Sequence, residues 1–211
     1  MRTRRLSGCV DMHGINYQTK EVKLMSGPKM LGLLVMMTLT MFLSLPSYGW
    51  ELEVEAVGIR GAINLEHVAI PPPEKEDFYQ VDAVMYLALP WSWQYQSGWE
   101  IRWTFNGAAG VLRGGGDTAG VVELGPGITF YKPSWRMMID LGTGLTALTR
   151  THFGDQDFGG PVQIVGQGGL SFDLGWNLFA GWRFHHISDA TLYGSHSKGV
   201  DLNMLELRYY Y

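Results

Sequence analysis

Hydrophobic and polar residues alternate with a period of two along most of the chain beyond residue 50. Between residues 79 and 89 the odd positions are all apolar, whereas Gln80 and Asp82 occupy even positions. In 99–106, aromatic and aliphatic residues again alternate with polar ones. Successive side chains of a β-strand point to opposite faces, so this pattern predicts strands with one apolar and one polar face.

Eight segments of this kind follow one another, and no helix-length period of 3.6 residues appears between them. Strands of roughly ten residues with this alternation are typical of outer-membrane barrels, which turn an apolar face to lipid and a polar face inward. A secreted β-sandwich, whose apolar face turns inward, is the alternative. The expected strands are about Glu51–Leu65, Phe78–Leu89, Trp99–Leu112, Val121–Lys132, Trp135–Thr149, Val162–Asp173, Asn177–Ala190 and Val200–Tyr211.

Aromatic residues near the strand ends favour the membrane barrel. Trp91, Trp99, Trp135 and Trp176 fall where the interfacial girdles of such barrels lie. The last expected strand ends on Tyr211, and a terminal aromatic resembles the signal by which bacterial outer-membrane proteins are recognised for insertion. We therefore expect an all-β protein, an eight-stranded antiparallel transmembrane β-barrel of the bacterial outer membrane. Side chains fill the interior of so small a barrel, so we do not expect a pore.

An uncharged apolar run ahead of the strands predicts a secretory signal peptide. The run covers 31–45 and is followed by small residues suited to a cleavage site. It is shorter than the roughly 20 residues that a membrane-spanning helix needs. We expect a signal peptide with an upstream extension at 1–49 and the mature barrel at 50–211. Met25 or Met30 is an alternative start position.

Composition and charge narrow the chemistry and the partners. The chain has 28 glycines and 8 tryptophans, which favours β-structure over helix. Residues 50–211 carry 10 lysines and arginines against 18 aspartates and glutamates, and this net charge near −8 disfavours nucleic acid as a partner. Cys9 precedes the apolar run, whereas a lipoprotein cysteine follows it. No cysteine lies in 50–211, which excludes disulfide and thiol chemistry there.

Candidate catalytic residues stand near the end of the chain. His186 and Ser188 fall on the apolar, lipid-facing row of their strand, and Asp201 begins the corresponding row of the last strand. Positions two apart on a strand are separated by about 6.5 Å, close enough for the side chains to form a hydrogen bond. A base beside a nucleophile, with a carboxylate to orient the base, is the arrangement of a serine hydrolase. A triad that faces lipid would act on a lipid.

The stretch HISDATLYGSHSKGVD, which holds these three residues, resembles the His-x-Ser-Asn-Ala and Gly-x-Glu pattern of the PagL-type lipid A 3-O-deacylases. These are eight-stranded outer-membrane barrels. The upstream stretch THFGDQDFGG is similar to the family's Gly-Asp-Gln region, and the resemblance covers about Ile139–Tyr211. It implies that Ser188 is the nucleophile and His186 the general base. Asp201 stands where the family has its glutamate.

The resemblance also implies an oxyanion region at Asp189 and Ala190. Asp189 replaces an asparagine of the family, and an anion there would oppose a developing negative charge unless it points away. A second asparagine, in the following loop, is replaced by His196 or Ser197, depending on where the alignment gap falls.

We expect an outer-membrane serine esterase that removes an ester-linked (3-O) acyl chain from the lipid A of lipopolysaccharide. It requires no cofactor and no metal, and its partners are lipopolysaccharide and membrane lipids. One alternative is a non-catalytic eight-stranded barrel with a structural or adhesive role. A phospholipase is another, which the residues alone do not separate from a lipid A deacylase. The sequence leaves the oligomeric state open.

Other titratable residues have structural interpretations. His185 falls on the inward face of its strand, so we expect it to pack in the polar interior with Arg183. His152, Asp155 and Asp157 lie in a glycine-rich stretch between strands. We expect these three to be turn residues, with a cation site as the alternative.

Overall fold

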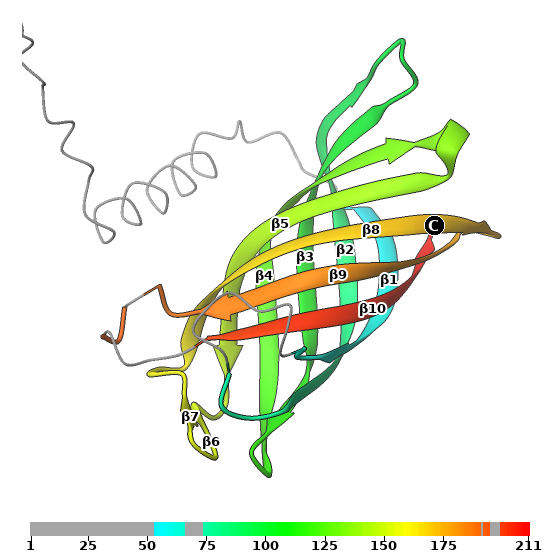
Figure 1. The fold of residues 1–211 in the computed structure, drawn as a ribbon. Coiled ribbons are helices and arrows are strands. Elements are labelled where there is room, and N and C mark those ends of the chain that lie inside the picture. The colour runs from blue at the N-terminus through cyan, green and yellow to red at the C-terminus, as the bar shows by residue number, and fades with distance from the viewer. Residues whose placement is uncertain (1–52, 66–73, 191, 195–198) are drawn as a thin grey trace, which may run out of the picture. The chain divides into compact units, whose positions relative to one another are not determined.

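The computed structural model describes residues 53–65, 74–190, 192–194 and 199–211, in which the chain forms a closed barrel (Figure 1). The order of strands around it is β1-β10-β9-β8-β5-β4-β3-β2, and a small hairpin of β6 and β7 lies between β5 and β8 in the chain. The strands are β1 (Glu53–Ile63), β2 (Phe78–Gln94), β3 (Glu100–Gly114), β4 (Asp117–Lys132), β5 (Met137–Leu148), β6 (His152–Phe153), β7 (Gln156–Asp157), β8 (Val162–Gly175), β9 (Leu178–Ser188) and β10 (Val200–Tyr210), and a 3-10 turn, η1 (Pro133–Trp135), joins β4 to β5.

The first and last strands close the barrel. β1 pairs with β10 in antiparallel register, from Ala56 opposite Tyr210 to Ile63 opposite Asn203. Closure pairs the backbone groups of both edges, which is what β-structure in lipid requires. The expected all-β, eight-stranded antiparallel barrel is confirmed. The described residues contain no helix of the length and apolarity needed to cross a membrane, and the expected signal segment at 1–49 lies outside them.

The strand ends differ in detail from those that the alternation predicts. β2 continues to Gln94 and includes Pro90, because the β2–β3 register shifts between Ala88 and Ser92. Proline lacks a backbone N–H, so it is tolerated at such an interruption of the ladder. The pair Gly115–Gly116, with φ of 55° and 83°, makes a two-residue turn that joins β3 directly to β4.

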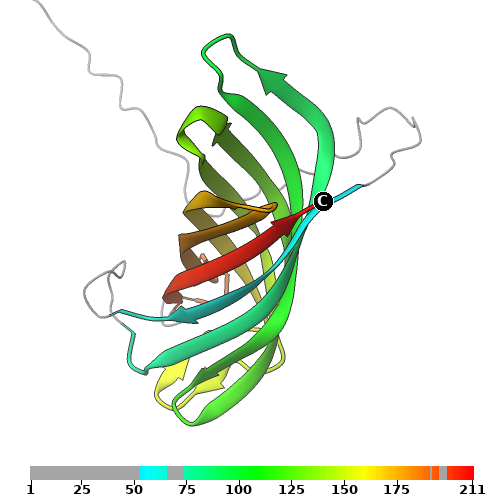
Figure 2. The ribbon, with the colours of Figure 1, turned by 90° about the vertical axis from the view of Figure 1, so that its right-hand side faces the viewer.

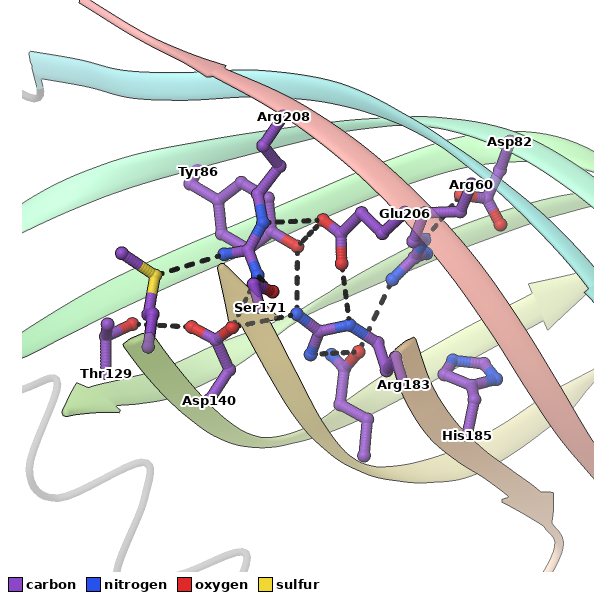
Figure 3. A network of polar contacts seen from close by, with 12 residues as sticks. Arg60, Asp82, Tyr86, Thr129, Asp140, Ser171, Arg183, His185, Glu206 and Arg208 are labelled. Atoms are coloured by element: carbon purple, nitrogen blue, oxygen red, sulfur yellow. Dashed lines mark hydrogen bonds and ion pairs between the residues drawn. The ribbon is translucent and has the colours of Figure 1, made fainter. Parts of the chain in front are cut away.

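Inward-facing side chains are polar along the middle of the barrel, as the alternation predicts. On β9, Arg183 and His185 are 1% and 0% exposed, whereas Trp182 on the outer face is 46% exposed. Arg60 and Arg208 are buried in the same interior. Figure 3 shows that these side chains converge from several strands into one network.

Each buried arginine in this network has acidic partners. Arg183 Nε lies 2.9 Å from Glu206 Oε2, and Arg208 Nε lies 3.1 Å from the other oxygen of the same carboxylate. Arg208 also lies 2.5 Å from Asp140, which Arg183 contacts at 3.3 Å (Figure 3). Arg60 pairs with an acid of β2 at 2.6 Å. Buried charges are tolerated when they are paired in this way.

We expect Arg183→Met to destabilise the barrel by about 3–5 kcal/mol, because it leaves buried carboxylates without their partner. The free energy of unfolding in urea, measured on the barrel folded in lipid vesicles, tests this. Arg136→Met is the matched control, because Arg136 is 56% exposed in its pair with Asp173 and should contribute at most about 1 kcal/mol. Equal losses in the two variants would contradict a stabilising interior network.

One end of the interior is apolar, which the alternation did not predict. Phe153 of β6 and Phe158, just after β7, are both 0% exposed. Their rings lie 5.6 and 5.9 Å from the ring of Phe78, and 5.4 Å from each other, in edge-to-face contacts. Of the three residues expected in a turn, Asp155 lies in the turn of a hairpin, whereas His152 and Asp157 lie in its two short strands, and the aromatic residues of this connection pack inside the barrel. Figure 2 shows this hairpin at the same end as the β3–β4 turn.

Candidate active site

His186, Ser188 and Asp201 meet on the outer face of the barrel, where β9 ends and β10 begins. Ser188 is the last residue of β9, and the register places Asp201 directly opposite His186. Ser188 lies two residues beyond His186 and shares its face. The pairing of β9 with β10 therefore brings together the three residues that the sequence predicts as a triad.

The imidazole of His186 lies between the other two side chains. Its Nε2 is 3.1 Å from Ser188 Oγ, and its Nδ1 forms a hydrogen bond with the Asp201 carboxylate. A carboxylate on Nδ1 fixes the tautomer in which Nε2 carries no proton. Nε2 is then free to accept the proton of the serine hydroxyl.

The shorter acid reaches the histidine because of the strand register. The backbone N–H of Asp201 donates to Glu74 at 2.8 Å, so it points away from β9. Asp201 and His186 therefore form a non-hydrogen-bonded pair, the kind in which facing side chains lie closer together. An aspartate at position 201 is therefore long enough to reach Nδ1, although the family has a glutamate at this position.

Burial differs between the acid and the base. The Asp201 side chain is 3% exposed, whereas that of His186 is 32% exposed. The neighbour of His186 on β8 is Gly166, and a Cβ added there would meet no atom within 4 Å. The imidazole therefore has open space on its β8 side, and the acid lies protected behind it.

Asp189 and Ala190, the residues expected to form an oxyanion region, lie in the turn after β9. Asp189 is 5% exposed, and its carboxylate accepts a hydrogen bond from the backbone N–H of Tyr193 at 3.0 Å. Its carbonyl accepts another from Leu192 at 2.9 Å. Ala190 is exposed and has a φ of 47°. The Asp189 carboxylate is thus engaged with the loop backbone, while the loop positions 196 and 197 lie outside the described residues.

The other nominated residues lie away from this site. His185 points into the barrel, where its Nε2 lies 2.8 Å from Glu123, as the expectation of an interior position requires. His152 and Asp157 are 3.2 Å apart across the β6–β7 hairpin and are both well exposed. In the described part of the chain, no group of three or more histidine, cysteine or acidic side chains is placed to hold a metal.

Two residues that the sequence did not single out contact the strand end that carries the acid. Glu74, just before β2, accepts from the Asp201 backbone, as given above. Gln156 of β7 donates from Nε2 to the carbonyl of Gly199 at 2.7 Å. No local pattern marks Glu74. Gln156 is the glutamine of the stretch that is similar to the family's Gly-Asp-Gln region, and this resemblance is the sequence signal for it.

Comparisons with known sequences and structures indicate the family of this chain. The sequence profile described as lipid A 3-O-deacylase (PagL) matches residues 79–210. The solved structure of the outer membrane enzyme PagL superposes with a TM-score of 0.57 at 17% identity, over 72% of this chain and 98% of that chain. No curated protein sequence matches this chain.

Two further solved barrels are similar at lower scores. The outer membrane protein Ail of Yersinia pestis has a TM-score of 0.44 and 12% identity, over 75% of this chain and 100% of its own. The N-terminal β-barrel domain of OprF from Pseudomonas aeruginosa has a TM-score of 0.39 and 15% identity, over 75% and 98% of the two chains. The profile match covers well over half of the 211 residues, including the three residues that meet on the outer face. The chain therefore belongs to the lipid A 3-O-deacylase (PagL) family of outer-membrane ester hydrolases.

Proposed function

We propose that Ser188, His186 and Asp201 form the catalytic triad with which this outer-membrane deacylase hydrolyses the 3-O ester of lipid A. The observation that carries the proposal is the position of the imidazole, which bonds to the acid through Nδ1 and lies 3.1 Å from the serine oxygen through Nε2. Family membership supplies the reaction class and the substrate. The roles of the individual residues follow from their geometry and chemistry.

In the first half of the reaction, His186 Nε2 takes the hydroxyl proton of Ser188 while Oγ attacks the ester carbonyl carbon. The resulting oxyanion requires hydrogen-bond donors, for which we propose the backbone N–H groups around Asp189 and Ala190. The bond from the carbonyl carbon to the sugar oxygen then breaks. His186 returns the proton to that oxygen, which leaves lipid A with a free 3-hydroxyl and the acyl chain on the serine.

In the second half, a water molecule gives its proton to His186 and attacks the acyl-enzyme. The bond to Ser188 Oγ breaks, the serine regains a proton from the histidine, and a free fatty acid departs. Asp201 stabilises the imidazolium that forms in each half. No step requires a cofactor.

The position of the triad relative to the membrane supports a lipopolysaccharide substrate. Of the four connections on the side of the triad, β3–β4 is a two-residue turn, but β1–β2, β5–β8 and β9–β10 are longer than the turns at 95–99, 133–136 and 176–177 on the opposite side. Outer-membrane barrels have short periplasmic turns and longer extracellular loops. The triad would therefore face the outer leaflet, and the substrate would reach it sideways from the membrane.

Purified barrel tests the substrate class directly. Incubated with lipid A or with diacyl phospholipid in the same detergent, it should release fatty acid from lipid A much faster. Fatty acid release from phospholipid alone would instead support the phospholipase alternative. Release from neither would leave the non-catalytic barrel as the better account.

The open space beside His186 gives a further prediction. We expect Gly166→Leu to lower the rate of deacylation by about 10²-fold, because a side chain there displaces the ester from the serine. Gly61→Leu is the matched control, because Gly61 is an exposed glycine of β1 where an added Cβ also meets nothing within 4 Å. Turnover of lipid A by both folded variants is the measurement. A wild-type rate for Gly166→Leu would show that the substrate does not occupy this space.

A further inference from the structure

We propose that Gln156 and Glu74 are positioning residues that hold the first residues of β10 so that Asp201 meets His186. The inference deepens the proposed triad and rests on it. Each residue bonds to the backbone within two positions of the acid, from a segment distant in sequence. Neither touches the reacting atoms, so each would act through Asp201.

Gln156 bridges two segments of the chain. It is 0% exposed. Its Nε2 donates to the Gly199 carbonyl at 2.7 Å, and its Oε1 accepts from the backbone N–H of Lys75 at 3.0 Å. Both ends of the amide are thereby used, and a buried amide with both ends bonded has one orientation. Gln156 therefore fixes the Gly199 carbonyl relative to the segment that precedes β2.

The hairpin that carries Gln156 is itself anchored. Phe153 and Phe158 flank it and pack into the end of the barrel against Phe78, as described above. The backbone N–H of Asp155 donates to Glu76 at 2.7 Å, which ties the hairpin to the segment before β2. The hairpin that holds Gly199 through Gln156 is thus packed against the phenylalanines at the end of the barrel. A side chain on such a support can hold a backbone group in one place.

Glu74 holds the other side of the same strand end. β1 ends at Ile63, opposite Asn203, so no partner residue of β1 faces Asp201. The Glu74 carboxylate accepts from the Asp201 N–H at 2.8 Å and takes the place of the missing strand. The acid is consequently fixed through its own backbone, two residues beyond the end of the β1–β10 ladder.

The chain at Gly199 is closely packed, so the acid cannot move far without breaking the triad. A Cβ at Gly199 would overlap the Ile187 carbonyl and would lie 3.0 Å from the Ser188 Cβ. The strand end therefore runs directly against the residue that bears the nucleophile. If the hydrogen bond to Gly199 or to the Asp201 N–H is removed, we expect the carboxylate to move away from Nδ1. A misplacement of about 1 Å can cost on the order of 10²-fold in rate.

The first test is Gln156→Met, which keeps the length of the side chain and removes both hydrogen bonds. We expect kcat for lipid A to fall about 10- to 100-fold with little change in KM, since the acid acts on the chemical step. Gln163→Met is the matched control. Gln163 is equally buried and donates to the Phe158 and Gly160 carbonyls of the same connection, at 3.0 and 2.6 Å, yet it has no bond to Gly199.

A double-mutant cycle separates action through Asp201 from a general loosening. In a barrel that already carries Asp201→Asn, Gln156→Met should lower kcat no further, because its effect passes through the lost carboxylate. A further loss as large as in the wild-type background would overturn the inference. So would wild-type kcat in folded Gln156→Met, or an equal loss in Gln163→Met.

Glu74 gives a second, independent arm. Glu74→Gln keeps an oxygen that can accept from the Asp201 N–H and should retain most of kcat, whereas Glu74→Ala should lose about 10-fold or more. Equal activity of the two variants would remove Glu74 from the inference. Folding is checked by heat-modifiable migration on gels. Full activity of the single variant Asp201→Asn would refute the role of Asp201 as the acid of the triad. An inactive Asp201→Asn together with a wild-type rate for Gln156→Met would refute only the positioning role of Gln156.

Discussion

Replacement of Ser188 by alanine should abolish the release of fatty acid from lipid A while the barrel stays folded. The variant removes the oxygen that lies 3.1 Å from His186 Nε2 and leaves no nucleophile for the ester carbonyl. Loss of the serine from a triad lowers kcat on the order of 10⁶-fold, down to what binding and the oxyanion donors supply. Turnover of lipid A by purified protein is the measurement.

Ser92→Ala is the control for this variant, because Ser92 is an exposed serine near the opposite end of the barrel. It should keep the wild-type rate. Both proteins must show heat-modifiable migration before their rates are compared. Undiminished turnover by folded Ser188→Ala would exclude Ser188 as the nucleophile.

Asp201→Asn should produce the second large effect, a loss on the order of 10⁴-fold in kcat with the fold intact. An amide in place of the carboxylate can donate to Nδ1, which favours the tautomer with the proton on Nε2. That histidine can no longer accept the serine proton. Asp173→Asn, at the opposite end of the barrel, is the control and should be as active as the wild type.

Asp201→Glu is the sharper version of the test. The family has glutamate here, yet Asp201 already reaches Nδ1 and its side chain is 3% exposed. A longer side chain must bend or push the imidazole away from Ser188. We expect kcat between those of the wild type and Asp201→Asn, because the charge is kept while the position is disturbed. If Asp201→Asn retains full activity in a folded barrel, a dyad of Ser188 and His186 or a role for Asp189 becomes the better account.

The strands and their faces could be predicted from the sequence because alternation is a local property. All eight long strands occur close to where the pattern placed them. The inward position of His185 and the outward position of His186 follow from the same period. Pro90 shows the limit of the approach, since only the register shift with β3 makes room for it within β2.

The support of the site could not be predicted, because it depends on contacts between distant segments. Gln156 and Gly199 are 43 residues apart, and Glu74 and Asp201 are 127 apart. The β6–β7 hairpin is too short to show an alternation of its own. Whether an aspartate suffices at position 201 likewise depends on the β9–β10 register, which the sequence does not reveal.

Mass spectrometry of lipid A tests the central claim most directly. It compares bacteria that lack the protein with bacteria whose outer membrane contains either the wild-type barrel or folded Ser188→Ala. We predict that lipid A from cells with the wild-type protein lacks one ester-linked acyl chain at the 3 position, and that lipid A from the other two strains keeps it. Identical lipid A in all three strains, or the same loss of an acyl chain with Ser188→Ala, would contradict the account.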